Sequence, residues 1–193
     1  MKETIERSLK QGADLRLKMA DTMAAEIVTA ATTIAEAFKA GRKLLLFGNG
    51  GSAADAQHIA AEFINRFLIE RPPLPAIALT TDTSVLTSIA NDYAFDEIFS
   101  KQVKALGRKG DVALGITTSG SSGDVLKALR AAKKLGMTTI ALTGEGGKAA
   151  SLSDIALQIP SRSTPRIQEA HIAVGHILCE LVDKILFDGA GKQ

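Results

Sequence analysis

The chain has 193 residues, and its 23 Lys and Arg against 21 Asp and Glu give a formal net charge of +2. Hydrophobic residues make up 46% of it, aromatic residues only 4%, and there is no Trp. This composition argues against disorder, and the length fits one domain with one core, so we predict a single domain over residues 1–193. The near balance of charge argues against the basic stripe of a dedicated nucleic-acid binder.

The cysteine content and the apolar runs indicate the compartment. The single cysteine, Cys179, lies in an apolar helical stretch, which predicts a buried thiol in a reducing environment. The first residues lack the apolar core of a signal peptide, and no apolar run approaches the ~18 residues of a membrane span. We therefore expect a cytoplasmic protein that does not bind membranes.

The first predicted element is an Ala-rich helical extension over residues 1–40. Apolar residues recur intermittently along it, and Gly12 is the candidate break between two helical segments. A helical extension before the first strand packs either on its own sheet or on a partner subunit. We favour the partner subunit and expect this extension to serve oligomerisation.

Short apolar runs alternate with helical patterns through the rest of the chain. The pattern predicts strands at 43–47, 75–80, 111–117, 138–143 and 154–159, and helices at 52–67, 83–90, 96–106, 122–135 and 165–187. This alternation predicts an α/β three-layer sandwich of Rossmann-like type, with a mainly parallel five-stranded sheet and helices on both faces. Ligands of such sheets bind beyond the carboxyl ends of the strands.

The loop after the first strand, Gly48-Asn49-Gly50-Gly51-Ser52, is a candidate phosphate site. Its glycines allow a sharp turn and close approach of a ligand, Ser52 is a natural N-cap, and the helix start attracts anions. The loop also fits the G-x-G-x-x-A form of a dinucleotide site. That motif needs an acidic residue about 20 positions on, and Asp82 lies too far along the chain. We expect phosphate here and no nucleotide cofactor.

The loop after the third strand is rich in hydroxyl groups. Thr117-Thr118-Ser119-Gly120-Ser121-Ser122 has a hydroxyl side chain at every position except the glycine, which suits a phosphate monoester at a helix start. No Lys of the Walker type is present, so ATP is not implied. The loop after the fourth strand, residues 143–148, is either a further ligand loop or a plain turn.

The residues that could carry out chemistry lie on two predicted helices. His58 and Glu62 are four residues apart and share one face, in a polar stripe with Asp55 and Arg66. Such a stripe is more often a solvated face, but this helix begins at a candidate phosphate loop.

The last predicted helix offers a second group. Gln168 and His176 project within about 80° of one another, two turns apart, whereas His171 lies off that line and fits a structural or surface role. His176 has apolar neighbours, so a core histidine is the alternative. Spacing alone leaves open whether the two helices meet.

Taken together, His58, Glu62, Gln168 and His176 offer two imidazoles, a carboxylate and an amide oxygen. Such a set can coordinate zinc. It can also supply a carboxylate base and an imidazole acid, the pair that aldose–ketose isomerisation needs. A metal there could polarise the substrate carbonyl.

At these residues the chain resembles the phosphoheptose isomerases of the sugar isomerase (SIS) domain family, over nearly its whole length. The resemblance lies in five motifs in the same order: Gly48-Asn49-Gly50-Gly51-Ser52, Asp55-Ala56-Gln57-His58, Ala90-Asn91-Asp92-Tyr93, Thr118-Ser119-Gly120-Ser121-Ser122, and Arg166-Ile167-Gln168-Glu169-Ala170-His171.

The resemblance implies conversion of sedoheptulose 7-phosphate to D-glycero-D-manno-heptose 7-phosphate through an enediol, the first step of nucleotide-heptose synthesis for lipopolysaccharide core. It implies Glu62 as the base and His176 as the partner acid. It also implies a homotetramer with sites at subunit interfaces, and a zinc site at His58, Glu62, Gln168 and His176. The implied substrate contacts are Asn49, Gly50, Gly51, Ser52, Glu62, Arg66, Asn91, Asp92, Thr117, Thr118, Ser119, Ser121, Ser122 and Gln168.

Two other functions compete with the isomerase. A non-catalytic SIS protein that binds the replication initiator DnaA is similar to this chain around residues 65–72, but it lacks counterparts of Glu62 and His176 and has Arg in place of Ser119. A sugar-phosphate sensor would be fused to a DNA-binding domain, and the chain shows no helix-turn-helix segment with a basic face. We favour the enzyme, with another ketose phosphate as an open choice of substrate.

Overall fold

The computed structural model describes residues 1–187, so the last part of the predicted domain, residues 188–193, lies outside the described residues. Its sheet has the order β2-β1-β3-β4-β5, and every strand pair is parallel. Every residue of β1 and β3 is buried, as expected of strands covered on both faces. The predicted fold class is confirmed. The strands are β1 (Leu44–Gly48), β2 (Ala76–Ala78), β3 (Val112–Thr117), β4 (Thr138–Thr143) and β5 (Ile155–Gln158).

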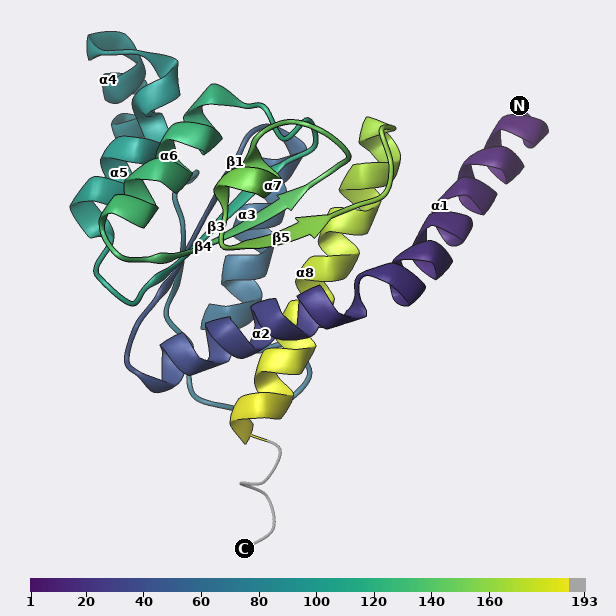
Figure 1. Ribbon diagram of the computed structural model, residues 1–193, viewed down its shortest axis with the longest axis horizontal. Helices are drawn as coiled ribbons and strands as arrows, with labels where there is room; N and C mark the ends of the chain where they lie inside the picture. Colours follow the sequence, from purple (N-terminus) through teal and green to yellow (C-terminus); the bar gives the residue numbers. More distant parts are fainter. Residues whose placement is uncertain (188–193) are drawn as a thin grey trace, which may run out of the picture.

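Helices cover both faces of the sheet and complete three layers (Figure 1). Leu44 and Leu46 pack toward α2, α3 and α8, whereas Leu45 and Phe47 pack toward α5, α6 and α7, because successive strand residues point to opposite faces. The helices are α1 (Lys2–Thr22), α2 (Ala24–Lys39), α3 (Gly51–Ile64), α4 (Thr83–Asp92), the 3₁₀ turn η1 (Phe95–Glu97), α5 (Ile98–Leu106), α6 (Gly123–Lys134), α7 (Ala149–Leu152) and α8 (Thr164–Phe187).

The break in the N-terminal extension lies at Met23, not at Gly12 as predicted. Gly12 is buried within α1, where an added Cβ would lie 3.1 Å from the Glu169 carboxylate of α8. The glycine therefore allows two helices to approach closely, a role that its position in the sequence does not reveal. The short helix α7 was not predicted either.

Helix α1 extends away from the sheet (Figure 1). Arg166 of α8 donates a hydrogen bond to the carbonyl of Ser8 and so anchors the middle of α1. Ile5, Leu9 and Leu17 remain largely exposed along it. Helix α2 covers its own sheet, contrary to the favoured packing of the whole extension on a partner subunit, whereas α1 leaves an apolar surface exposed.

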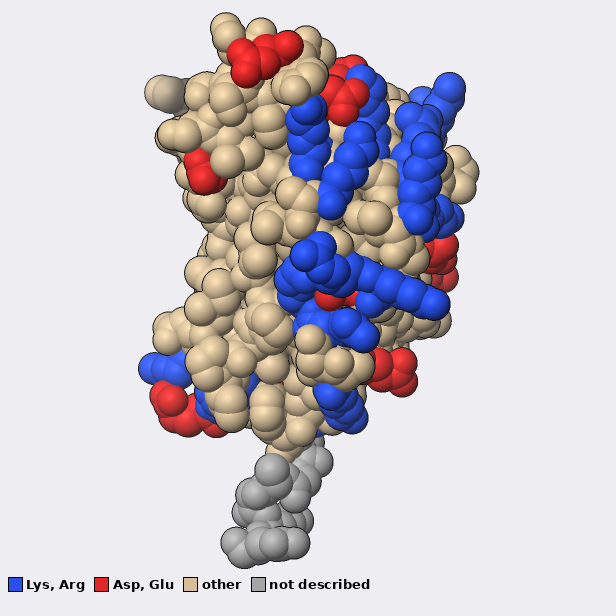
Figure 2. Space-filling view, turned by 90° about the vertical axis from the view of Figure 1, so that its left-hand side faces the viewer, with Lys and Arg blue, Asp and Glu red and all other residues tan. Residues whose placement is uncertain are grey.

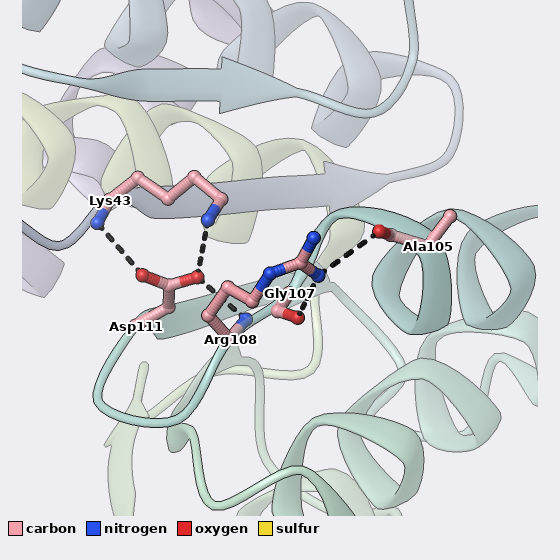
Figure 3. A network of polar contacts seen from close by, with 5 residues as sticks. All are labelled: Lys43, Ala105, Gly107, Arg108 and Asp111. Atoms are coloured by element: carbon pink, nitrogen blue, oxygen red, sulfur yellow. Dashed lines mark hydrogen bonds and ion pairs between the residues drawn. The ribbon is translucent and has the colours of Figure 1, made fainter.

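A buried carboxylate joins two strands at the amino edge of the sheet (Figure 3). Asp111, just before β3, accepts hydrogen bonds from the backbone N–H of Lys43 at 3.1 Å and of Arg108 at 2.8 Å. The Lys43 Nζ lies 2.6 Å from Asp111 Oδ2. This network stabilises the edge of the sheet opposite the glycine- and hydroxyl-rich loops.

Basic side chains gather on the face that carries α5 and α6 (Figure 2). The groove between these helices is lined by Lys104, Lys127, Arg130 and Lys134, and Glu97 pairs with Lys127 at 2.9 Å. These residues come from two separate segments, so no local pattern in the sequence indicates the cluster. It lies on the opposite side of the sheet from the histidine-bearing helices α3 and α8.

Within residues 1–187, no helix combines the length and apolarity that a membrane crossing requires.

Cys179 is buried in α8, as predicted. Burial raises the pKa of its thiol from 9.0 to about 12, and the negative charges of Glu62 and Asp183 add to the effect. The thiolate is the reactive form, so its population at neutral pH falls by on the order of a thousand-fold. We expect the native protein to resist Ellman's reagent and the guanidinium-unfolded protein to react at once. Fast reaction of the native protein would contradict this burial.

Candidate active site

Helices α3 and α8 lie side by side and run in the same direction. An added Cβ at Gly51 would meet Gln168, and one at Gly175 would lie 2.6 Å from Ile59 Cδ1, so both glycines mark close approaches. The two helices are therefore parallel, with Gly51 opposite Gln168 near their starts and Ile59 opposite Gly175 about two turns later. This pairing brings the two predicted groups of chemical residues to one place.

His58, Glu62 and His176 converge between these helices. The Nε2 of His58 lies 3.1 Å from Glu62 Oε1 and 3.3 Å from the Nε2 of His176. One potential ligand atom from each of the three residues lies within 4.8 Å of the others. The Phe67 ring stacks on His176 with centroids 5.4 Å apart. Two imidazole nitrogens that face each other beside a carboxylate form a donor set that suits zinc.

Asp55 lies one turn before His58 on α3. Burial raises the pKa of its carboxyl, and the nearby His58 partly opposes the shift. Its Oδ2 is buried and has no hydrogen-bond partner in the described part of the chain. An unpaired buried oxygen next to the three converging residues is a candidate contact for a ligand or an ordered water.

The glycine loop shapes the end of β1. Gly48 has no room for a side chain, because an added Cβ would lie 2.6 Å from the Ile116 carbonyl, and Gly50 has a φ of 54°. Gly50 is the N-cap of α3, and Ser52 is buried in the first turn, so the prediction of Ser52 as N-cap is wrong. The Asn49 amide donates to Asp124 Oδ2 at 2.8 Å.

The hydroxyl loop follows β3, the strand adjacent to β1. The Oγ1 of Thr117 lies 3.0 Å from the Oγ of Ser122 and 3.4 Å from the Oγ of Ser119. Ser119 Oγ also accepts from the backbone N–H of Ser121 at 3.2 Å. Neither α3 nor α6 is capped by the side chain of its N-cap residue. Two helix starts that attract anions therefore lie beyond neighbouring strands.

The loop after β4 supports the hydroxyl loop. The N–H of Gly144 donates to the Thr118 carbonyl at 3.2 Å, and the N–H groups of Lys148 and Ala149 donate to the Gly120 carbonyl at 2.8 and 2.9 Å. An added Cβ at Gly147 would collide with the backbone of Gly120. The loop therefore supports the hydroxyl loop, a role that is neither of the two, ligand loop and plain turn, that the sequence left open.

The remaining predicted contacts are not among the three residues that converge. Arg66 lies beyond the end of α3, because this helix stops at Ile64 instead of Phe67, and it pairs with Glu70 at 3.0 Å on the surface. Asn91 and Asp92 end the exposed helix α4, and the Asn91 amide donates to the Asp92 carboxylate at 2.9 Å. The side chain of Gln168, the fourth predicted zinc ligand, lies beside Gly51 at the start of α3, two helical turns before His176 on α8.

For three residues near the site, the sequence predicted no role. Asp124 orients Asn49, Phe67 stacks on His176, and Asp55 presents a buried oxygen. Asp55 was visible only as part of a polar stripe. The positions of Asp124 and Phe67 depend on contacts between segments, and no local pattern could have revealed them.

The chain is similar in sequence and fold to several known proteins. The profile of the SIS domain family matches residues 9–144. The phosphoheptose isomerase of Aquifex aeolicus is 54% identical over 96% of this chain and 98% of its own length. That of Thermodesulfovibrio yellowstonii is 62% identical over 82% of this chain and 79% of its own. A solved phosphoheptose isomerase from Neisseria gonorrhoeae has a TM-score of 0.90 at 44% identity, over 95% of this chain and 98% of that one.

Proposed function

Since the chain belongs to the phosphoheptose isomerases of the SIS domain family, we propose that it converts sedoheptulose 7-phosphate to D-glycero-D-manno-heptose 7-phosphate. The convergence of His58, Glu62 and His176 carries this proposal, because it provides a base and an acid at one place. The step would begin nucleotide-heptose synthesis for lipopolysaccharide core, in the cytoplasm. A role limited to DnaA binding gains no support, since Glu62, His176 and Ser119 are all present.

The proposed reaction moves two protons. The Glu62 carboxylate takes the proton from C1 of the ketose while His176 donates a proton to the C2 oxygen, which gives an enediol. Glu62 then returns its proton to C2, and His176 recovers the proton of the C1 hydroxyl as the aldehyde forms. The product has the same atoms as the substrate, and both side chains regain their starting protonation.

The two helix starts at the carboxyl edge of the sheet would hold the substrate ends. Hydroxyl groups and backbone N–H groups suit the phosphate monoester. The candidate phosphate contacts are Ser52, Thr117, Thr118, Ser119, Ser121 and Ser122. Backbone groups of Gly50 and Gly51 and the side chains of Asn49, Arg66, Asn91, Asp92 and Gln168 are the candidate sugar contacts.

His58, Glu62 and His176 would hold zinc, with Gln168 as the fourth proposed ligand. When bound, zinc would polarise the sugar carbonyl as a Lewis acid. We expect the metal-free protein to bind Zn²⁺ in calorimetric titration, and His58→Gln to weaken that affinity by more than the ~10–100-fold that loss of an outer-shell partner costs. Equal Zn²⁺ affinity in both proteins would exclude this site.

The protein would act as a homotetramer. An apolar groove between α1, α2 and α8, lined by Met19, Ile27, Ile177 and Leu181 among others, adjoins the exposed apolar residues of α1. A second copy that packs there would cover both, as the extension over residues 1–40 predicts. Sedimentation of the purified protein tests this assembly.

The direct test is turnover. The purified protein is mixed with sedoheptulose 7-phosphate, with and without added Zn²⁺, and the aldose phosphate is followed by NMR. We expect the heptose 7-phosphate to appear. A folded protein that yields no aldose phosphate in either condition would refute the proposed reaction, and shorter ketose phosphates in parallel show whether the substrate alone is wrong.

A further inference from the structure

Arg71 and Asp183 form a buried ion pair on the side of α3 and α8 away from the loops. Their side chains are 1% and 5% exposed, and Arg71 Nε donates to Asp183 Oδ1 at 2.8 Å. The other oxygen, Asp183 Oδ2, has no hydrogen-bond partner within residues 1–187. A buried pair gains little net stability over apolar residues of similar size, because both charges lose their hydration. What it does supply is directional bonding.

The same guanidinium closes the end of α3. Its Nη2 donates to the carbonyl of Glu62 at 2.9 Å, and its Nη1 donates to the carbonyl of Phe63 at 2.6 Å. These are carbonyls of the last turn, which a helix leaves without internal partners. Arg71 is therefore fixed on the backbone of Glu62, the proposed base.

The partner carboxylate belongs to the helix of the proposed acid. Asp183 follows His176 by seven residues on α8, which is two turns, so both project from the same face. One guanidinium thus connects the backbone of Glu62 with the face of α8 that carries His176. The Glu62 and His176 side chains themselves are only partly buried. The Arg71–Asp183 pair joins their helices at a point that is buried from solvent.

We propose that Arg71 and Asp183 are positioning residues, which fix α3 and α8 in register so that Glu62 and His176 meet at the sugar. This inference rests on the proposed function and deepens it. A displacement of about 1 Å between catalytic groups can cost about 100-fold in rate. Loss of the pair should therefore lower kcat without removing any group that touches the substrate.

Two variants test the proposal. Arg71→Lys keeps the positive charge, but an ammonium group cannot donate to three acceptors from one plane as a guanidinium does. The double variant Arg71→Met/Asp183→Leu removes both charges, so no unpaired charge remains buried. For each we expect kcat to fall by about 10-fold or more with KM changed by less than about 2-fold, and Zn²⁺ affinity to weaken by about 10-fold. The imidazole NMR signals of His58 and His176 should shift in the metal-free protein.

The Lys43–Asp111 pair at the amino edge of the sheet, whose hydrogen bonds involve neither α3 nor α8, provides the control (Figure 3). Lys43→Met should lower stability and leave kcat within about 2-fold of the wild type. The proposal is overturned if folded Arg71→Lys keeps its kcat, Zn²⁺ affinity and imidazole signals, or if Lys43→Met loses kcat in proportion to stability as the Arg71 variants do. Should the wild type show no turnover, the proposed reaction fails, while Zn²⁺ affinity and imidazole signals still decide the positioning role.

Discussion

Replacing Glu62 with glutamine should lower kcat for sedoheptulose 7-phosphate by about 100- to 10,000-fold, the usual contribution of a positioned base. Glutamine has nearly the same shape, so the packing of α3 should remain, but its amide cannot accept the C1 proton. KM should change much less, because the proposed phosphate contacts are other residues, at the starts of α3 and α6. NMR of the sugar products in single-turnover and steady-state experiments measures both constants.

The Glu62 experiment needs two accompanying measurements. Glu36→Gln removes a carboxylate from the exposed face of α2 and should keep full activity. Solvent deuterium provides the second readout, since a base that exchanges its proton with water labels C2 of the product, and Glu62→Gln should also lose this labelling. Unchanged turnover in folded Glu62→Gln would remove Glu62 from the role of base.

Much of the architecture follows from local patterns in the sequence. Buried apolar runs that end at glycines located the strands, and the alternation with helical segments gave the parallel sheet, since parallel strands need crossover connections. The loops at 48–52 and 117–122 were visible because glycine and hydroxyl groups at a helix start have specific conformational and anion-binding roles. These features depend on neighbouring residues alone.

The site needed information that no local pattern contains. Spacing placed His58 and Glu62 on one helix and His176 on another, but only the close approach at Gly51 and Gly175 shows that these helices run in step. The predicted break at Gly12 is wrong for the same reason. The small size of this glycine allows α1 to approach α8, which the sequence pattern does not show. Helix α3 ends before Arg66, and Arg71 binds its last carbonyls. Arg71 also binds Asp183 of α8, a contact between distant segments that no local pattern shows.

His171 should make the protein sensitive to acid. The residue is fully buried in α8, and burial lowers the pKa of its imidazole from 6.5 to about 4. Neither ring nitrogen makes a well-formed hydrogen bond in the described part of the chain, although the Thr143 backbone opposes the lowering of the pKa. The folded state therefore holds this imidazole neutral, and its burial favours the structural role over the surface role among those predicted for His171.

The direction of the pH effect follows from proton counts. Between pH 6.5 and about 4 the unfolded chain binds a proton at His171 and the folded chain does not, so stability falls as pH falls through this window and is fully present above it. The loss attributable to His171 is on the order of 3 kcal/mol. In His171→Leu this contribution is absent, so its unfolding free energy should decline less on acidification than that of the wild type.

Urea unfolding followed by circular dichroism, at several pH values through that window, measures the difference. Both proteins share all other titrating groups, so subtracting their curves isolates His171, provided that protein concentration is held equal in case subunits dissociate. The absolute stability of His171→Leu at neutral pH does not matter, because only the slope against pH carries the argument. Parallel curves would mean that His171 gains a proton in the folded state, and that the interior between α8 and β4 opens to water more readily than its burial indicates.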